Sequence, residues 1–449
     1  MLRKIECNKY LEILECIHIF KRRNYWFCFC NITYQVFILD EHEANILLRL
    51  QTKMNTKHDQ LYSSIEGINI LENLKKMIGD FTINEISSLP INSFYLKFNN
   101  QCNMNCNYCY LTNSNSPVKE IDLNIALEAV KKMHILGAQG VGIHGGNPLM
   151  NFSKLKELII GIRLINPEMK IGLTTNGTLI NNEIATFLEK MNVIVSVEID
   201  GGEKYIHDSL KNYKNGNSSF EDIYNGIKTL KKKKILGALE ATFSNQHEIS
   251  LDTFINSFNW EKNIPIVISR VKGKPLDSHK SKYIFYDKSL KNLLNKDIEI
   301  AKKNLYSNVF TDTKAYLINL YSKNNKNFSK YICSCILDKV SVDIDGEVYV
   351  CPKLHRKKLS LGNVCSDTFI NEFNKNRLEK MQYFNKNKLK KYWFINLLEP
   401  CVDMLYQSFD RTWHIVDYKI LEKYFEDLIY ESINLNIHEL KEMWENSGF

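Results

Sequence analysis

The chain has 449 residues, of which 44% are apolar and 24% are charged, and these proportions are typical of a folded globular protein. They exclude a disordered or fibrous chain. The net charge of +8 is modest and spread over isolated lysines, which argues against a dedicated nucleic-acid-binding protein. At roughly 150 residues per domain, the length predicts two or three domains.

No apolar run follows the basic start of the chain, and the longest apolar stretches, Glu157–Ile165 and Val193–Ile199, are too short to span a bilayer. We therefore expect a cytoplasmic protein with no membrane partner. Twelve cysteines in a reducing compartment need an explanation other than disulfides. Four precede residue 31, three lie between 102 and 109, and five lie between 333 and 401.

The first region, residues 1–88, contains patterns for two short strands and two helices. The strands fall within Asn24–Leu39, and the helices follow Asp40 and cover Ile65–Ile78. Cys28 and Cys30 alternate with phenylalanines in the first of these strands, so we expect both thiols on one side of the strand, in the core.

Residues 89–275 alternate short β-rich runs with amphipathic helical segments. The six predicted strands are Phe94–Phe98, Val141–His144, Lys170–Thr174, Val193–Ile199, Leu239–Phe243 and Ile264–Ser269. The five predicted helices are Asn124–Leu136, Ser153–Ile165, Asn182–Lys190, Phe220–Lys232 and Leu251–Phe258. This order predicts an α/β fold with parallel strands, as a barrel or an open sheet, with its chemistry at the carboxyl ends of the strands. Residues 276–332 read as a helical connector, and 333–449 form a third region.

A CxxxCxxC spacing, formed by Cys102, Cys106 and Cys109, lies on an asparagine-rich loop directly after the first of these strands. Three thiolates without a fourth ligand in the loop suit a [4Fe–4S] cluster that keeps one iron open. Structural zinc is the alternative, but zinc usually takes four ligands, and no histidine follows at a matching distance.

This motif resembles the signature of the radical SAM superfamily, which has a partial (β/α)6 TIM-like barrel. The resemblance implies that the open iron binds S-adenosylmethionine and that a low-potential electron donor reduces the cluster. Cleavage of the sulfonium then yields a 5′-deoxyadenosyl radical that abstracts hydrogen from the substrate. It also implies that Tyr108, just before the third cysteine, packs near the adenine.

Further segments between Ser93 and Ser269 resemble the same family. The turn Gly145-Gly146-Asn147-Pro148 is similar to the GGEP motif that contacts the methionyl amino group, and its glycines allow close backbone approach. Thr175-Asn176-Gly177 resembles a TNG segment in which Asn176 would contact the ribose. The stretch from Val195 to Phe220 resembles the SIDG, HD and GSF series of a subfamily with a C-terminal SPASM extension.

Three residues depart from the family pattern, and all three concern the binding of S-adenosylmethionine. Asn147 replaces a glutamate, Glu198 replaces a serine and Lys211 replaces an arginine. We hypothesise that the anionic contact to the methionyl ammonium moved from position 147 to Glu198, while Lys211 keeps a cation near the methionyl carboxylate. The alternative is a weakened or inactive site.

The third region resembles a degenerate SPASM, or twitch-like, extension. Alternating residues around Asp345-Gly346 predict a hairpin with a tight turn, and Cys335 and Cys351 match the opening of the family's auxiliary-cluster motif. In its second half only Cys401 matches, because Tyr392, Ile395 and Leu405 occupy the other positions. Two alternatives stay open: one auxiliary [4Fe–4S] cluster held by some of Cys333, Cys335, Cys351 and Cys401, or none.

The first region resembles, with low motif specificity, the winged-helix-like PqqD-like domain of enzymes that modify ribosomal peptides. Such a domain would capture a leader peptide by strand addition; the alternative is a cap packed on the barrel. Together, the resemblances imply a radical SAM oxidoreductase that modifies a peptide or small protein by a thioether or carbon–carbon crosslink or a related oxidation. The alternatives are a sulfatase-maturase-like activity and a catalytically silent peptide-binding iron–sulfur module.

Overall fold

The structure is a computed structural model of the whole chain. It describes residues 14, 17–30, 36–54, 65–78, 90–109, 117–243, 251–258, 264–270, 298–300, 309–311, 338–352, 355–386, 423–427 and 429–430. Most of the predicted connector over 276–332 falls outside these ranges. Within them, no helix is both long and apolar enough to cross a membrane.

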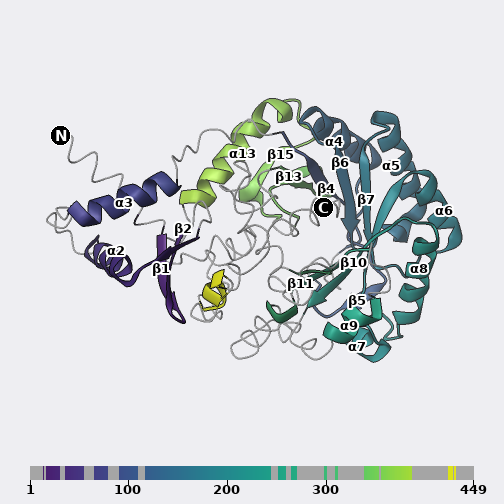
Figure 1. Cartoon of the computed structure of the whole chain (residues 1–449). Coiled ribbons are helices and arrows are strands. Elements are labelled where there is room, and N and C mark those ends of the chain that lie inside the picture. Colours follow the sequence, from purple (N-terminus) through teal and green to yellow (C-terminus); the bar gives the residue numbers. More distant parts are fainter. Residues whose placement is uncertain are drawn as a thin grey trace.

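A ten-stranded sheet forms the centre of the molecule, in the order β12-β11-β10-β8-β7-β6-β4-β13-β14-β15 (Figure 1). All six predicted strands are present and parallel: β4 (Ser93–Asn99), β6 (Gly140–Gly145), β7 (Lys170–Thr175), β8 (Val193–Glu198), β10 (Leu236–Phe243) and β11 (Ile266–Arg270). The short β12 (Val309–Thr311), which was not predicted, continues the parallel order after β11. The prediction of a parallel α/β fold is confirmed.

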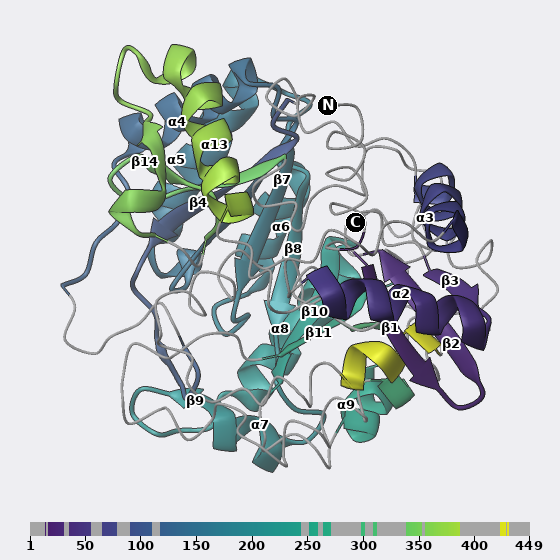
Figure 2. The same cartoon turned by 90° about the vertical axis from the view of Figure 1, so that its left-hand side faces the viewer.

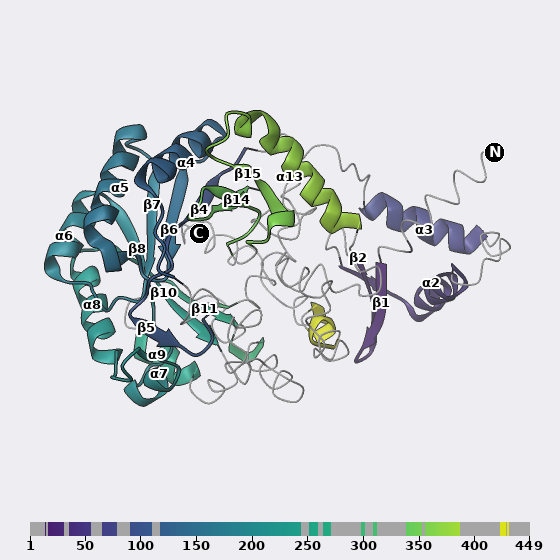
Figure 3. The same ribbon diagram turned by 180° about the vertical axis from the view of Figure 1, so that it is seen from behind.

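Helices cover one face of this sheet, which curves so that its other face points inward (Figures 1 and 3). All five predicted helices are present: α4 (Leu123–Ile135), α5 (Phe152–Ile165), α6 (Asn182–Lys190), α8 (Phe220–Lys232) and α9 (Leu251–Phe258). Val141 and Ile143 of β6 and Ile171 and Leu173 of β7 are buried among the hydrophobic residues of these helices. The residues that alternate with these along each strand point to the inner face of the sheet, because successive side chains of a strand point to opposite faces.

The predicted C-terminal hairpin extends the same sheet. β13 (Lys339–Val342) and β14 (Glu347–Tyr349) pair antiparallel around a turn in which Gly346 has φ +82°, a conformation that favours glycine. β13 also pairs in parallel with β4, while β15 (Ser360–Asn363) and α13 (Phe369–Lys386) complete this part. The first barrel strand and the C-terminal extension are therefore joined by backbone hydrogen bonds.

The N-terminal unit is an antiparallel sheet of β1 (Ile17–Arg22), β2 (Tyr25–Cys30) and β3 (Val36–Leu39), with α2 (Glu41–Met54) and α3 (Ile65–Ile78) beside it (Figure 2). The sequence predicted all of these elements except β1. Asp40 and Glu43 cap α2 reciprocally, each side chain accepting a hydrogen bond from the backbone of the other, at 2.7 and 3.1 Å. Cys28 and Cys30 are fully buried in the core of this unit, as predicted.

The opposite face of the N-terminal sheet is covered by a short segment near the end of the chain. Phe20, Phe27 and Phe29 share a hydrophobic cluster with Tyr424, Phe425, Ile429 and Tyr430. Arg22 pairs with Asp427, and the Arg23 guanidinium lies 4.8 Å from the centre of the Tyr430 ring. Both faces of the sheet are thus occupied by other parts of the described chain.

Candidate functional site

The cysteine loop begins where β4 ends, at the carboxyl end of the parallel strands. Within the loop, β5 (Met104–Cys106) pairs antiparallel with β9 (Lys211–Tyr213), which places Cys106 opposite Lys211. Neither strand was predicted, because three-residue strands on a polar loop carry no alternation of apolar residues. The pairing connects the cysteine loop to the segment that follows α7 (Lys204–Leu210).

The three thiols influence one another. Burial raises the pKa of Cys102, while a hydrogen bond from the Met104 backbone amide (3.4 Å) opposes this rise. Burial also raises the pKa of Cys106 well above its usual value, Lys211 acts in the opposite direction, and the neighbouring thiols Cys109 and Cys102 add to the rise. Metal binding at these thiols would therefore release protons.

The three thiols suit an iron–sulfur cluster better than a single metal ion. In the described ranges, no three His, Cys, Asp or Glu side chains are placed to hold one metal ion. A single zinc would require thiolates about 2.3 Å from one centre. In a cubane cluster each thiolate binds a different iron, so three mutually interacting thiols on one loop with a basic neighbour fit that group.

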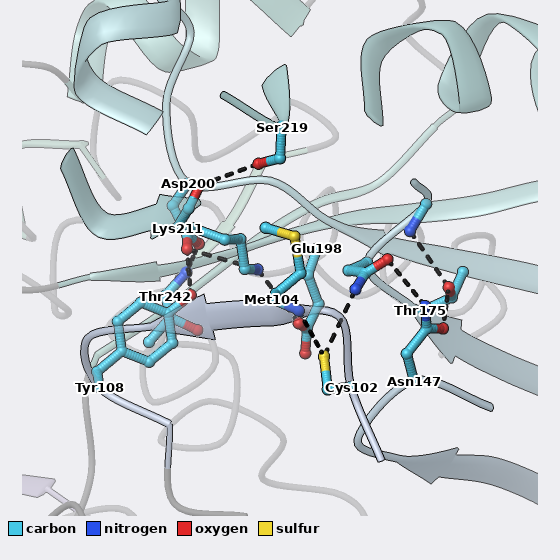
Figure 4. Close-up of polar contacts among 12 residues, drawn as sticks. Cys102, Met104, Tyr108, Asn147, Thr175, Glu198, Asp200, Lys211, Ser219 and Thr242 are labelled. Atoms are coloured by element: carbon cyan, nitrogen blue, oxygen red, sulfur yellow. Dashed lines mark hydrogen bonds and ion pairs between the residues drawn. The ribbon is translucent and has the colours of Figure 1, made fainter. Parts of the chain in front are cut away.

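Asn147 is fully buried, and every polar group of its side chain is engaged (Figure 4). Its Oδ1 accepts hydrogen bonds from the Thr175 hydroxyl (2.9 Å) and from the Leu149 amide (3.3 Å). Its Nδ2 donates to Asn176 Oδ1 (3.1 Å) and, more weakly, to Asn103 Oδ1 (3.4 Å). Asn147 therefore connects the ends of β6 and β7 to the cysteine loop.

Asn176 reaches the same loop. Its Nδ2 donates to Asn103 Oδ1 at 2.9 Å and lies 3.6 Å from Cys102 Sγ. The side chain is only 3% exposed. Asn103 was not among the predicted site residues, although Asn147 and Asn176 both donate to its Oδ1. Its position directly after Cys102 is the feature of the sequence that could have indicated it.

The two glycines before Asn147 allow the backbone before Cys102 to pack closely against them. A Cβ on Gly146 would lie 2.2 Å from the Gln101 carbonyl oxygen, and one on Gly145 would lie 2.4 Å from the Asn99 carbonyl oxygen. The sequence predicted close backbone approach here, and the structure identifies the approaching backbone as the loop before Cys102. Pro148 follows as the first residue of a buried 3-10 turn capped by Asn147.

Lys211 is a buried cation, 1% exposed, between two carboxylates (Figure 4). Its Nζ lies 3.2 Å from Glu198 Oε2 and 3.5 Å from Asp200 Oδ2. Burial alone would lower its pKa, but Asp200 and Glu198 together raise the pKa of Lys211 well above its usual value. The side chain of Glu198 remains 44% exposed.

Asp200 fixes this ion pair in place. Its carboxylate accepts hydrogen bonds from the Tyr108 hydroxyl and from the Thr242 amide (2.9 Å), and burial together with Asp200 raises the pKa of Tyr108 well above its usual value. The Asp200 amide donates to His207 Nδ1 (3.2 Å), and His207 Nε2 lies 3.1 Å from the Ser219 hydroxyl. The predicted site residues Tyr108, Glu198 and Lys211 thus meet through a residue that was not among those predicted.

Glu240 is a further carboxyl group that sequence reasoning missed. It is the register partner of Glu198 on the adjacent strand, so both point to the inner face. Burial and the nearby Glu198 raise the pKa of Glu240 to about 7. Only the strand register brings these two carboxyl groups together.

Of the predicted auxiliary ligands, only Cys351 is described; it is buried just after β14, at 4% exposure. Cys333, Cys335 and Cys401 lie outside the described residues, as do the non-matching positions Tyr392, Ile395 and Leu405. The structure therefore leaves the two alternatives for this region as they were. Cys365 is exposed.

A parallel α/β sheet with three cysteines after its first strand defines a class of iron–sulfur protein, and comparison with known proteins identifies the family. Residues 96–244 match the Radical SAM superfamily, and residues 333–395 match the SPASM iron–sulfur cluster-binding domain. The chain belongs to the radical SAM superfamily and carries a SPASM domain. A radical SAM domain uses a [4Fe–4S] cluster and S-adenosylmethionine, and SPASM domains bind auxiliary clusters.

The chain is also similar to individual proteins. The uncharacterized protein MJ0907 of Methanocaldococcus jannaschii is 31% identical over 290 residues, covering 64% of this chain and 91% of that protein. A cysteine-type anaerobic sulfatase-maturating enzyme of Clostridium novyi is 25% identical over 295 residues, 61% of this chain and 77% of the enzyme. The structure of native anSMEcpe with bound AdoMet and Cp18Cys peptide superposes with a TM-score of 0.57 over 77% of this chain and 100% of that one, at 20% identity.

Proposed function

We propose that this protein cleaves S-adenosylmethionine reductively and uses the 5′-deoxyadenosyl radical to abstract hydrogen from a peptide or protein substrate. The product would be a thioether or carbon–carbon crosslink, or a related oxidation. The observation that carries the proposal is the meeting of three cysteines and a buried lysine at the carboxyl ends of the parallel strands, where Cys106 pairs with Lys211.

In this proposal, Cys102, Cys106 and Cys109 hold the catalytic cluster, which when bound supplies the electron for cleavage. Lys211 favours the thiolate form of Cys106, because its charge opposes the rise in the pKa of that thiol. Gly145 and Gly146 allow the loop to pack, and Asn147 and Asn176 hold its first turn through Asn103. Tyr108, fixed by Asp200, supplies an aromatic wall for the adenosine.

The Glu198–Lys211 ion pair matches the two charges of an amino acid. The methionyl end of S-adenosylmethionine carries an ammonium and a carboxylate, and Glu198 and Lys211 offer one opposite charge to each at a separation of 3.2 Å. Asn147 cannot accept the ammonium without losing a present partner, since both lone-pair positions of its Oδ1 are occupied. This supports the transfer of the anionic contact from position 147 to Glu198.

Anaerobic reconstitution tests this function. The reconstituted protein, given a low-potential reductant and S-adenosylmethionine, should form 5′-deoxyadenosine. Glu198→Gln should weaken S-adenosylmethionine binding about tenfold or more, because a charge-assisted hydrogen bond is lost. Asn147→Glu, which restores the family residue, should not improve binding. A filled cluster that forms no 5′-deoxyadenosine would instead support the silent iron–sulfur module.

The substrate side of the proposal concerns the N-terminal unit. Within the described residues β3 is an edge strand of its sheet, and Ile38 on it is 57% exposed. We infer that a leader peptide adds to this edge, since main-chain hydrogen bonds are available there. We further propose a cytoplasmic location, a low-potential electron donor as partner, and no nucleic-acid or membrane partner. The proposed domains cover residues 1–88, 89–275 and 333–449, and the connector 276–332 joins the second to the third.

A sulfatase-maturase-like activity is the second candidate, favoured by the similarity to the Clostridium novyi enzyme. The missing thiols at Tyr392, Ile395 and Leu405 argue against it. Incubation with a cysteine-containing sulfatase-type peptide separates the two candidates. Loss of the cysteine sulfur with gain of an aldehyde, detected by mass spectrometry, would favour the maturase.

A further inference from the structure

A second polar cluster lies on the inner face of the sheet, where the barrel meets the C-terminal hairpin. Lys97 of β4 and His144 of β6 are register partners, and Ser341 of β13 pairs with Tyr95 of β4. All three strands run parallel, so their carboxyl ends meet at the edge that carries the cysteine loop. None of these side chains has a role in the function proposed above.

Asp343 organises the cluster. Its Oδ1 accepts from Lys97 Nζ at 3.0 Å, and its Oδ2 lies 2.7 Å from His355 Nδ1. His355 Nε2 in turn lies 3.2 Å from the Ser341 hydroxyl, and its ring stacks on Tyr349 with the centroids 4.7 Å apart. Lys97 and His355 together hold the pKa of Asp343 well below its usual range despite its burial. Asp343 is therefore a carboxylate with both oxygens engaged.

His144 is the member of the cluster without a partner for one nitrogen. Its Nε2 is buried and has no hydrogen bond in the structure, a situation that costs about 1–3 kcal/mol unless something satisfies it. Tyr95 contacts its ring edge-to-face, with the centroids 5.8 Å apart, so the ring is held by packing. Burial, then His355 and Lys97, lower the pKa of His144 to about 3, so this imidazole is neutral.

The cluster offers hydrogen-bond donors that are not in use. Lys97 has three N–H groups, and Asp343 takes one. His144 adds an N–H when its neutral ring carries the proton on Nε2, and both oxygens of Asp343 are already occupied. We propose that Lys97 and His144 bind an acceptor oxygen of the substrate, a carboxylate or a peptide carbonyl, on the inner wall of the barrel.

This inference rests on the proposed function for its substrate class, but binding can be measured separately from catalysis. Two small probes present the two oxygen types: N-acetylglycine carries a carboxylate, and N-acetylglycine N-methylamide carries carbonyls only. Their affinities for the reconstituted protein can be measured by ligand-observed saturation-transfer NMR, a method suited to weak binding. Formation of 5′-deoxyadenosine without peptide reports on the proposed function alone.

We expect at least one probe to bind the parent protein. Lys97→Met should weaken it about tenfold and His144→Phe about fivefold, the losses expected for a charged and a neutral hydrogen bond. Lys170→Met, on the exposed start of β7, is the matched control and should bind as the parent does. Preference for N-acetylglycine would identify a carboxylate, and equal binding of both probes would identify the peptide carbonyl.

His144→Phe is decisive if Lys97→Met fails to fold, because phenylalanine keeps the ring contact with Tyr95 and removes only the nitrogens. Melting temperature checks the fold of each variant. The inference is overturned if neither probe binds the parent, or if both bind His144→Phe as tightly as the parent. Either result, obtained with a parent that forms 5′-deoxyadenosine, would leave the proposed function intact.

Discussion

Cys106 and Lys211 are direct partners across the β5–β9 pair, so a buried ammonium lies on the strand paired with the one that carries the proposed cluster ligand Cys106. The same ammonium forms ion pairs with both Asp200 and Glu198. In the proposed function, this one side chain contributes both to the cluster site and to the binding of the methionyl group, so its replacement should affect both.

Lys211→Met should lower the free energy of unfolding by about 3–5 kcal/mol, because Asp200 would remain as a buried charge without its cation. It should also lower the iron bound per chain. Lys211→Arg, which keeps the charge, should recover most of both losses. Chemical denaturation and iron analysis under anaerobic conditions measure the effects. Equal iron content and stability in Lys211→Met and the parent would contradict this role.

Gly146→Ala should prevent cluster binding. The added methyl group would meet the Gln101 carbonyl oxygen at 2.2 Å, so the cysteine loop would have to move. Gly172→Ala is a matched control in β7, since a Cβ there has no heavy atom closer than 3.9 Å. The absorbance of the reconstituted cluster reports the outcome. A full cluster in Gly146→Ala would show that the loop tolerates displacement.

Glu240 should make stability depend on pH. Its pKa is raised to about 7 in the folded protein, against about 4.3 for an unfolded chain, so the folded state holds the extra proton between these values. Stability should therefore fall as pH rises towards 7, by about 2 kcal/mol from pH 5.5 to 8. Glu240→Gln should remove this part of the decline in urea unfolding. Parallel pH profiles for the two proteins would contradict the assignment.

The auxiliary cluster can be tested by counting iron. With one auxiliary cluster, the parent should hold roughly eight irons per chain, and Cys351→Ser should reduce this towards four. Cys365→Ser changes an exposed thiol and should leave the count unchanged. A parent that holds roughly four irons would show that the buried Cys351 is a core residue only.

The sequence predicted the elements better than their contacts. All six parallel strands and five of the six helices described between 89 and 275 were expected, because apolar residues alternate with period two in the strands and recur on one face of the helices. The seven-residue helix α7 was missed. Strand β1 was missed, although buried and less buried residues alternate along part of it. Strands β5 and β9 have only three residues each and show no alternation of apolar residues. The pairing of Glu198 with Glu240 follows from register, which local sequence does not encode.

For the candidate site as well, the sequence predicted individual residues but not the contacts between them. Motifs singled out Asn147, Asn176 and Lys211, but the residues that connect them, Asn103 and Asp200, became evident only from distances. Hydrogen-bond partners of buried amides depend on how loops meet. The asparagine at position 147 is a departure from the family in sequence, yet in the structure it is a saturated link between strands and loop.

The parallel pairing of β4 with β13 has a consequence for how the chain folds. Ser93 pairs with Lys339, so the strand that leads into the cysteine loop lacks one neighbour until most of the polypeptide has been synthesised. An edge strand in that state is open to pairing with other chains, and contacts so distant in sequence form slowly. Production of this enzyme on the ribosome should therefore depend on chaperone protection of β4, and truncation before residue 339 should yield aggregates rather than a smaller barrel.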